Sequence, residues 1–393
     1  MISQRVRTIT PSATLSLNAR LQEMRAQGTE IINLSVGEPD FETPKFIRDV
    51  AHDAMESGWT RYTPTSGHPE AREAVCRHVL RTRNVEVKPE QVILSSGVKH
   101  SLSQTLLSLV NPGDEVMIGA PYWVSYPELI RLADGIPVVV ETRIEDGFRL
   151  TREALEAQLT PRTMGIILNE PGNPTGVVSS ASEVLEIIEF ARDNDLWVIS
   201  DEIYEAMVHE GKLNSPFSID PERVSYISGL SKSFAMTGWR LGWSVSEPER
   251  ANAIGRLQSH NAANPCSISQ ATVAAALDGM DHPELQEMYA AFRQRKDLVV
   301  EKLNAMDGVQ FVAPKGAFYV FVDVSNFLGN DKRVTDANQF CLGLLEEMGV
   351  AAVPGDAFGS PGCLRLSYAR PNTEIAEALD RLDQFLQKTS ETS

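Results

Sequence analysis

The sequence predicts an α/β fold with a mainly parallel central sheet, and one repeating pattern carries that prediction. Between about residues 90 and 250, short apolar runs bounded by turn residues alternate with amphipathic segments such as 181–193. Such alternation is typical of parallel strands joined by helices. In these sheets the ligand binds beyond the carboxyl ends of the strands. Six runs are expected to be strands: 91–94, 115–118, 165–168, 196–200, 224–228 and 241–245.

The pattern changes after about residue 285. A long charged helix is expected over about 284–306, followed by the hairpin-like run GAFYVFVDV and a final amphipathic helix from about Glu374. This succession predicts a smaller α+β domain, and we expect the first 40 or so residues to join it. The large domain would then span 45–285, and the small domain would be built from 1–44 and 286–393.

Composition and charge exclude several classes of function. The 393 residues are 42% hydrophobic and 23% charged, which is ordinary for a globular protein. A net charge of −17 repels phosphate backbones, so nucleic acid is not an expected partner. No apolar run resembles a signal peptide or a membrane span. The cysteines lack zinc-site spacing, which predicts no metal site and reduced thiols in a cytoplasmic protein: Cys76, Cys266, Cys341 and Cys363.

Two residues that follow predicted strands point to covalent and acid–base chemistry. Lys232 lies in SGLSKSFAMTGWRLGW, among small and apolar residues. Burial there would lower its pKa and leave a nucleophilic amine, whereas the alternative is a solvated surface charge. Asp201 directly follows 196–200, and a buried carboxylate needs a cation or donor as partner, such as a protonated pyridine nitrogen. The alternative for Asp201 is a helix cap. Tyr204, three residues on, is in reach of the same ring's phenolic oxygen.

A small polar turn between a strand and a helix predicts an anion site. Ser95, Ser96 and Gly97 follow the strand 91–94, and leucines at helical spacing come after them. Backbone N–H groups and the positive end of the helix dipole favour a phosphate at such a point, although a plain helix cap gives the same pattern. Arg240, eight residues beyond Lys232, could bind the same phosphate.

Three more side chains fit an aromatic ligand and a carboxylate. The turn NEPGNPTG presents Asn173, whose amide can donate to a ring oxygen. Trp123 in PYW can stack on an aromatic ring, or belong to the core. Arg365 in CLRLSYA lies between apolar residues, so it needs a carboxylate from the substrate or from a structural ion pair. All these signals together predict one ligand: a pyridine that carries a phosphate and an aldehyde.

Taken as a whole, the motifs resemble those of the class I and II aminotransferases of pyridoxal phosphate (PLP) fold type I. Within them, the chain is most similar to the bacterial aspartate aminotransferases of the subgroup that includes prephenate aminotransferases. The resemblance runs nearly end to end and rests on TPSATLSLNAR, LSVGEPDFETP, RYTPTSGHPEAREAV, NPGDEVMIGAPYWVSYPE, NEPGNPTG, VISDEIYE, SKSFAMTGWRLGW, GAFYVF, VAAVPGDAFG and LRLSYA. It implies a PLP-dependent enzyme with a large domain around a mainly parallel sheet and a smaller domain built from both termini.

The resemblance implies a role for each matching residue. Lys232 would hold PLP as a Schiff base and shuttle the proton, with Asp201 on the pyridine nitrogen. The remaining cofactor contacts would come from Tyr204, Asn173, Trp123, Gly97, Val98 and Arg240, with Tyr62 reaching across from a second subunit of a homodimer.

Substrate contacts are implied in the same way. The α-carboxylate would lie at Gly37 and Arg365, near Trp123 and Asn173, and Lys99 would contact the distal carboxylate of a dicarboxylic substrate. This implies ping-pong transamination from aspartate to 2-oxoglutarate. Alternatives are an aromatic, prephenate or alanine aminotransferase, or a β-lyase or 1-aminocyclopropane-1-carboxylate synthase-like enzyme on the same fold. A PLP-binding regulator is disfavoured because the chain lacks length and basic charge for a DNA-binding domain.

The chain departs from the resemblance at a few positions beside the expected site. Val98 and His100 flank Lys99 where relatives usually have Gly and Gln, and Glu170 and Gly172 lie in the turn that carries Asn173. The segment QSHNAANPCS also replaces a Ser/Thr-rich stretch. Thr10 stands where many prephenate-using relatives have lysine, which disfavours prephenate as a substrate.

Overall fold

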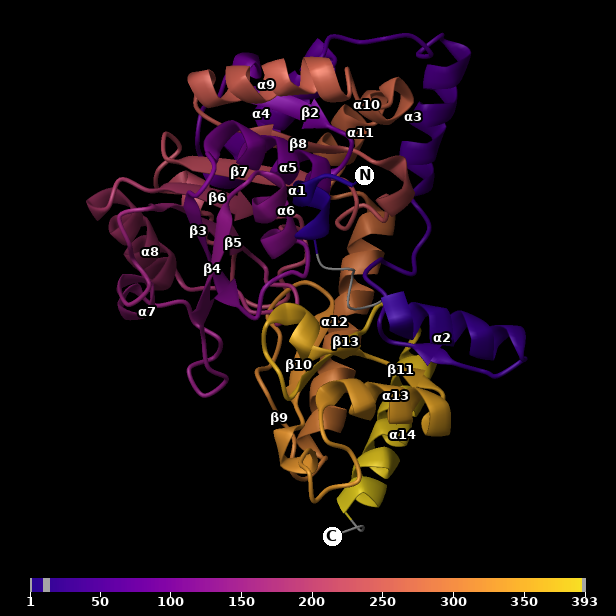
Figure 1. Cartoon of the computed structure of the whole chain (residues 1–393). Coiled ribbons are helices and arrows are strands. Elements are labelled where there is room, and N and C mark those ends of the chain that lie inside the picture. Colours follow the sequence, from indigo (N-terminus) through magenta and orange to yellow (C-terminus); the bar gives the residue numbers. More distant parts are fainter. Residues whose placement is uncertain (1, 10–14, 391–393) are drawn as a thin grey trace.

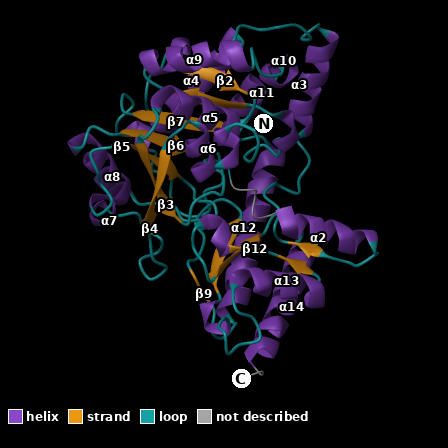
Figure 2. Ribbon diagram, viewed as in Figure 1, coloured by secondary structure: helices purple, strands orange, loops and turns teal. Residues whose placement is uncertain are grey.

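A computed structural model describes residues 2–9 and 15–390 and arranges them in two lobes (Figure 1). The upper lobe contains a seven-stranded sheet with helices packed around it (Figure 2). The lower lobe combines residues from both halves of the chain, coloured indigo and orange to yellow in Figure 1. Among the described residues, no helix is both apolar enough and long enough to cross a bilayer.

The seven-stranded sheet has the order β2-β8-β7-β6-β5-β3-β4 and is mainly parallel, as predicted. Only β8 runs antiparallel to its neighbours β2 and β7. Each of the six predicted runs overlaps a strand of this sheet. The strands are β2 (Val92–Ser95), β3 (Glu115–Ala120), β4 (Ile136–Glu141), β5 (Thr163–Asn169), β6 (Trp197–Asp201), β7 (Val224–Gly229) and β8 (Gly242–Val245).

Strand β4 was missing from the sequence prediction, and its place in the sheet explains why. It is an edge strand that pairs only with β3, and most of its residues are at least partly exposed. Pro137 in its second position weakens the strand pattern, and proline is tolerated there because an edge strand has one unpaired side. Strands β2, β6, β7 and β8 are buried along their whole length, and their apolar runs carry no proline that hides the strand pattern.

The helices around the sheet follow the local sequence signals. In α8 (Ala181–Asp193), Ser180 and Glu183 form a capping box, and an apolar face that includes Ile187 and Ile188 packs inward. The other helices of this lobe are α3 (Lys45–Glu56), α4 (Pro69–Arg83), α5 (Val98–Leu109), α6 (Tyr126–Leu132), α7 (Arg152–Glu156), α9 (Pro248–Asn261), α10 (Ser267–Ala271) and α11 (Val273–Asp278). Short 3-10 turns lie at Pro89–Gln91, Pro216–Ser218 and Thr237–Trp239.

The lower lobe is an α+β unit reached through α12 (Pro283–Asn304), which runs down from the upper lobe (Figure 1). The run GAFYVFVDV contributes a single strand, β10 (Tyr319–Asp323), which pairs antiparallel with β9 (Gln310–Phe311) and β13 (Cys363–Ser367). The fourth strand of this sheet is β12 (Val353–Pro354). Helices α13 (Ala337–Met348) and α14 (Asn372–Ser390) and the 3-10 turns Ser325–Phe327 and Gly355–Phe358 complete it.

Part of the N-terminal segment joins the lower lobe. Strand β1 (Ile32–Asn33) pairs parallel with β11 (Val350–Ala351), and α2 (Leu15–Ala26) packs Leu21 and Met24 against the lower lobe. The short helix α1 (Gln4–Arg7) instead lies against α6 of the upper lobe. The predicted domain boundaries at 44/45 and 285/286 stay a prediction.

A buried network of charges fixes the segment that follows β6. Arg83, at the end of α4, contacts the carboxylates of Glu202, at 2.6 Å, and Glu205. The guanidinium carbon also lies 4.0 Å from the centre of the Tyr226 ring, whose hydroxyl donates to Glu205. His78 contacts Glu205 at 3.2 Å. Since Arg83 and Glu202 are almost completely buried, each charge depends on the other for compensation.

We expect Arg83→Met to lower the free energy of unfolding by about 3–5 kcal/mol, because it leaves two carboxylates buried without their cation. Arg77→Met on the same helix is the matched control. Its ion pair with Asp278 is half exposed, so it should change stability by about 0–1 kcal/mol. Urea unfolding monitored by fluorescence and circular dichroism measures both, and equal losses would show that the buried network is not a distinct stabilising feature.

Candidate functional site

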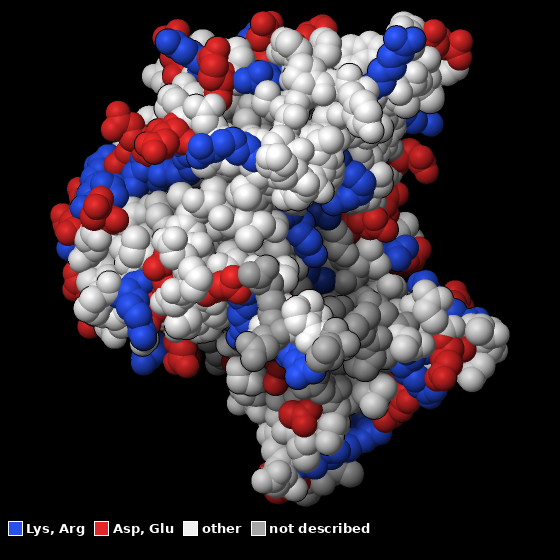
Figure 3. All heavy atoms as spheres, turned by 45° about the horizontal axis from the view of Figure 1, so that its top comes forward, with Lys and Arg blue, Asp and Glu red and all other residues white. Residues whose placement is uncertain are grey.

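The carboxyl ends of the sheet strands open into a cavity of about 220 Å³. Side chains that follow β3, β5, β6 and β7 line it, and Arg365 of β13 enters from the lower lobe. A hollow with Lys and Arg side chains at its wall is visible between the lobes in Figure 3. Ten of the predicted site residues line the cavity: Gly37, Val98, Lys99, Trp123, Asn173, Asp201, Tyr204, Lys232, Arg240 and Arg365.

Asp201, the last residue of β6, is a buried carboxyl group at the floor of this cavity. It is 3% exposed, accepts a hydrogen bond from the Tyr126 hydroxyl at 2.8 Å, and has the Ile203 N–H at 3.3 Å. Burial raises its pKa to about 6, although the bond from Tyr126 favours the ionised form. No helix begins after it, so Asp201 does not act as a helix cap. A cation next to this carboxylate would compensate its burial.

Lys232 is the buried amine of the site. It lies in the turn that follows β7, and its Nζ donates to the carbonyl oxygen of Gly37 at 2.5 Å. Burial lowers its pKa to about 8, while the nearby carboxylate of Glu38 acts in the opposite direction. Thr237 donates to Glu38 at 2.9 Å and holds that carboxylate in place. At neutral pH an appreciable fraction of an amine with this pKa is unprotonated and nucleophilic.

The turn after β5 joins two parts of the site through Asn173. Its side-chain N–H donates to the Tyr204 hydroxyl at 3.4 Å, and its side-chain oxygen accepts from Arg365 at 3.2 Å. The buried carboxyl group of Glu170 closes this turn, because it accepts from the backbone N–H and the hydroxyl of Ser179 at 3.0 and 2.5 Å. Burial raises the pKa of Glu170 to about 7.

Arg365 is a buried guanidinium without a carboxylate partner among the described residues. It donates to the Ser35 carbonyl at 2.7 Å and lies 4.6 and 5.1 Å from the ring centres of Tyr319 and Phe358. Its Nε has no hydrogen-bond partner among the described groups. Burial lowers its pKa. An isolated buried cation of this kind is chemically suited to a ligand carboxylate, and among the described residues the alternative of a structural ion pair does not hold.

The expected phosphate turn lies at the start of α5. Gly97 has φ 92°, and a Cβ on it would come within 2.5 Å of the Arg240 guanidinium, so glycine is required where the backbone and Arg240 meet. Ser96 donates its N–H to His100 at 3.2 Å, and burial lowers the pKa of that imidazole. The helix leaves the Val98 N–H without an intrahelical acceptor. The turn therefore combines an arginine with a helix N-terminus.

Lys99 and Trp123 meet on another wall of the cavity. The Lys99 ammonium lies 4.9 Å from the centre of the Trp123 ring. Burial lowers the pKa of Lys99, and the charge of Arg240 adds to this effect. Trp123 also packs edge-on against Tyr126, with ring centres 5.3 Å apart.

Two tyrosines of the cavity were missed from the sequence, and two predicted positions lie elsewhere. Tyr126 hydrogen-bonds Asp201, and Tyr319 lines the cavity from β10. Tyr319 stands among apolar residues in GAFYVFVDV, and a buried tyrosine hydroxyl needs a partner, which is the signal that could have singled it out. Tyr126 lies between Ser125 and Pro127 and carries no such local signal. Gly97 lies behind Arg240, whereas Tyr62 is 91% exposed and outside the cavity. Thr10 lies outside the described residues.

Comparisons with known proteins agree with this geometry. The family model for aminotransferase class I and II matches residues 29–382. The chain belongs to this family. It is 39% identical over 390 residues to an aspartate aminotransferase of Bacillus sp. (strain YM-2), covering 98% of this chain and 99% of that protein. It is 40% identical over 395 residues to an aspartate/prephenate aminotransferase of Cereibacter sphaeroides, covering 98% of each.

Solved structures show the same fold. The aspartate aminotransferase of Thermus thermophilus with maleate superposes with a TM-score of 0.93 at 38% identity, covering 98% of this chain and 99% of that one. The enzyme from Rhizobium meliloti gives 0.94 at 36% identity, with the same coverage. The predicted family resemblance and fold type I are confirmed, and the protein is a PLP-dependent aminotransferase.

The residues of the cavity fit this cofactor. PLP carries a phosphate, a basic pyridine nitrogen, a phenolic oxygen and an aldehyde. The cavity offers an arginine beside a helix N-terminus, a buried carboxyl group at Asp201, hydroxyl and amide donors at Tyr204 and Asn173, and a buried amine at Lys232. Each functional group of the cofactor therefore has a chemically matched partner.

Proposed function

We propose that the enzyme transfers the amino group of a dicarboxylic L-amino acid, aspartate, to a 2-oxo acid, 2-oxoglutarate, in ping-pong fashion. The observation that supports this most is Arg365, a buried guanidinium that has no carboxylate partner within residues 2–9 and 15–390. Lys99 offers a second cation in the same cavity, which suits a substrate with two carboxylates. Several relatives also carry the name aspartate aminotransferase.

We propose that Lys232 both holds the cofactor and moves the substrate proton. Its lowered pKa supports the first role, because an amine that is partly neutral near pH 7 would be able to hold an aldehyde group covalently. With cofactor and substrate bound, the Lys232 amine would take up the α-proton of the substrate and later give it back. When bound, the cofactor supplies an electron sink for the charge left at the α-carbon.

The other cavity residues orient the two ligands in this proposal. Asp201 keeps the pyridine nitrogen protonated, and Tyr126 holds the carboxylate in position for it. Tyr204 and Asn173 donate to the phenolic oxygen, and Trp123 stacks on the ring. The phosphate lies at Gly97, Val98 and Arg240. Arg365 and the Gly37 backbone hold the α-carboxylate, with Asn173 and Trp123 beside it.

We propose that two chains form a homodimer with shared active sites. Tyr62 supports this, because it is 91% exposed although it lies in a motif of the family's phosphate site. A second hollow, lined by Met55, Trp239 and Arg240 among others, opens beside the cavity, and Arg240 lines both. Exposed aromatic and apolar side chains next to a ligand site are typical of a surface that another chain covers.

We also propose that the enzyme acts in the cytoplasm. We propose further that residues 45–285 form one domain and that residues 1–44 and 286–393 together form the other. All four cysteines are free in the structure, which suits a reducing compartment. Cell fractionation with antibody detection checks the location, and limited proteolysis checks the boundaries near residues 44 and 285.

Lys232→Ala should abolish transamination while leaving noncovalent cofactor binding. Borohydride treatment followed by peptide mass spectrometry should find the cofactor fixed to Lys232 in the wild type and to no lysine in the variant. Consumption of 2-oxoglutarate with aspartate as donor identifies the reaction. Labelling of a different lysine contradicts the assignment of Lys232, and product formation without loss of 2-oxoglutarate would indicate a lyase instead.

Lys99→Ala should lower kcat/KM for aspartate. The ratio of the two kcat/KM values should correspond to a loss of about 1–3 kcal/mol of transition-state binding, the scale for losing one partner of a charge-assisted bond. Phenylalanine should be affected much less, because its side chain has no carboxylate for Lys99 to bind. Lys88→Ala is the control, because Lys88 is an exposed lysine that precedes β2, whereas Lys99 follows that strand. If aspartate and phenylalanine lose the same factor, Lys99 does not read the distal carboxylate.

Mixing inactive Lys232→Ala with an inactivating Tyr62→Ala chain should restore activity. In the mixed dimer one site combines both substitutions, while the other has an intact Lys232 from one chain and an intact Tyr62 from its partner. Refolding the two variants together, then assaying the mixture, measures the recovery, and sedimentation velocity gives the mass. A fully active monomer, or a mixture without recovery, contradicts the shared site.

A further inference from the structure

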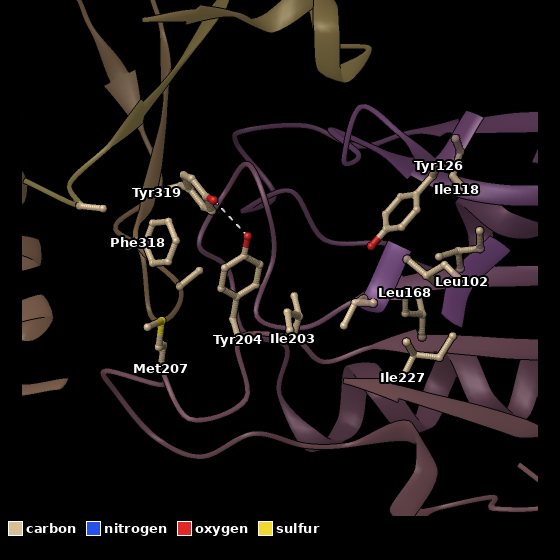
Figure 4. Close-up of a cluster of buried hydrophobic side chains, with 14 of the residues drawn as sticks. Leu102, Ile118, Tyr126, Leu168, Ile203, Tyr204, Met207, Ile227, Phe318 and Tyr319 are labelled. Atoms are coloured by element: carbon tan, nitrogen blue, oxygen red, sulfur yellow. Dashed lines mark hydrogen bonds between the residues drawn. The ribbon is translucent and has the colours of Figure 1, made fainter. Parts of the chain in front are cut away.

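The hydroxyl groups of Tyr204 and Tyr319 meet across the two lobes. Tyr204 follows β6 of the upper lobe, whereas Tyr319 begins β10 of the lower lobe, and their oxygens are 3.0 Å apart (Figure 4). The rings are nearly perpendicular, with centres 5.7 Å apart. Both side chains are buried, and both line the predicted cofactor cavity.

The surroundings restrict what the Tyr319 hydroxyl can do. Among the described residues, Tyr204 is its one hydrogen-bond partner. Gly37 closes the space above it, because a Cβ there would lie 3.3 Å from the Tyr319 oxygen. The Arg365 guanidinium carbon lies 4.6 Å from the Tyr319 ring centre. Arg365, which offers a cation for a substrate carboxylate, and Tyr319, which contacts Tyr204, therefore pack directly against each other.

Both hydroxyls keep their hydrogens at neutral pH. Burial raises the pKa of Tyr204 and of Tyr319, and the charge of Arg365, on the adjacent strand β13, opposes this effect at both. Asp201 at the end of β6 is the other charged group that acts on Tyr204, and it also raises that pKa. Each hydroxyl thus has a single hydrogen to donate and lone pairs with which to accept.

The direction of the bond follows from this count. Under the proposed function, Tyr204 donates its single hydrogen to the phenolic oxygen of PLP. The Tyr204 oxygen must then accept from its neighbours, namely the side-chain N–H of Asn173 at 3.4 Å and the hydroxyl of Tyr319. A hydroxyl that accepts one hydrogen bond donates a stronger one, because the chain of bonds is polarised in one direction.

We propose that Tyr319 is a positioning residue that donates to Tyr204 and thereby strengthens the bond from Tyr204 to the phenolic oxygen of the cofactor. This inference rests on the proposed function, since it requires Tyr204 to contact that oxygen. It adds a residue of the lower lobe to the groups that tune the cofactor. The cofactor's electronic state consequently depends on how the lower lobe is seated against the upper one.

Tyr319→Phe in the full-length protein loaded with PLP tests the proposal. The measurement is the pH midpoint of the visible absorbance of the bound cofactor, which needs no turnover. A donated bond stabilises the charged phenolic oxygen, so weakening that bond should raise the midpoint. A rise of about a few tenths of a pH unit is expected, since cooperative strengthening is a minor fraction of one hydrogen bond. Tyr204→Phe removes the direct donor and should give a larger rise.

The double variant separates action through Tyr204 from a direct effect. In the Tyr204→Phe background, adding Tyr319→Phe should leave the midpoint unchanged, because the hydroxyl through which Tyr319 acts is already gone. Tyr368→Phe is the matched control. Tyr368 is an equally buried tyrosine of the lower lobe, but its hydroxyl contacts the Ala317 carbonyl at 3.3 Å instead of Tyr204. Its midpoint should equal that of the wild type.

The outcomes distinguish this inference from the proposed function. The positioning role of Tyr319 is overturned if Tyr319→Phe does not shift the midpoint, or if it gives the same shift with and without the Tyr204 hydroxyl. In either case a shift in Tyr204→Phe still supports the proposed contact of Tyr204 with the cofactor. No shift in Tyr204→Phe itself overturns the proposed contact of Tyr204 with the phenolic oxygen. General loosening of the lobe would shift the midpoint of Tyr368→Phe as much as that of Tyr319→Phe, and equal shifts in the two variants would also overturn the proposal.

Discussion

The site depends on how the segment after β6 is held from two sides. Asp201 and Tyr204 line the cavity, while Glu202 and Glu205 of the same segment bind Arg83. A segment anchored by buried charges on one side cannot move without separating them, which is energetically costly. The pyridine and phenolic contacts proposed for the cavity side thus rest on a charge network whose residues do not line the cavity.

Burial then sets the chemistry of the two central titratable groups. The same desolvation lowers the pKa of Lys232 to about 8 and raises that of Asp201 to about 6, because it disfavours the charged form of each. The amine becomes available as a nucleophile near neutral pH. The carboxyl group becomes dependent on a cation, and the pyridine nitrogen of the cofactor is such a group when protonated. One physical cause therefore produces a nucleophile and a cation site in one cavity.

The lower lobe contributes groups to the cavity in which we propose that the substrate binds. Arg365 and Tyr319 enter from the neighbouring strands β13 and β10. Each contacts one residue of the upper lobe: Arg365 donates to Asn173, and Tyr319 contacts Tyr204. A guanidinium buried without a carboxylate is unfavourable in isolation, so a substrate carboxylate relieves a cost that the folded protein carries. With an overall charge of −17, the protein needs such concentrated positive charge to bind an anion.

By itself the sequence determined the α/β class, the buried strands and most of the cavity residues. Apolar runs and turn residues are local signals, and a parallel sheet brings its strand ends to one edge, so Asp201, Asn173 and Lys232 could be placed together. The edge strand β4 was lost because Pro137 interrupts its otherwise apolar run, and only the unpaired side of an edge strand accommodates such a proline. Only the tertiary structure decided what lies across that edge. The partners of Tyr126, Glu38 and Tyr319 come from distant parts of the chain, and no local pattern records which side chains packing brings within hydrogen-bond distance.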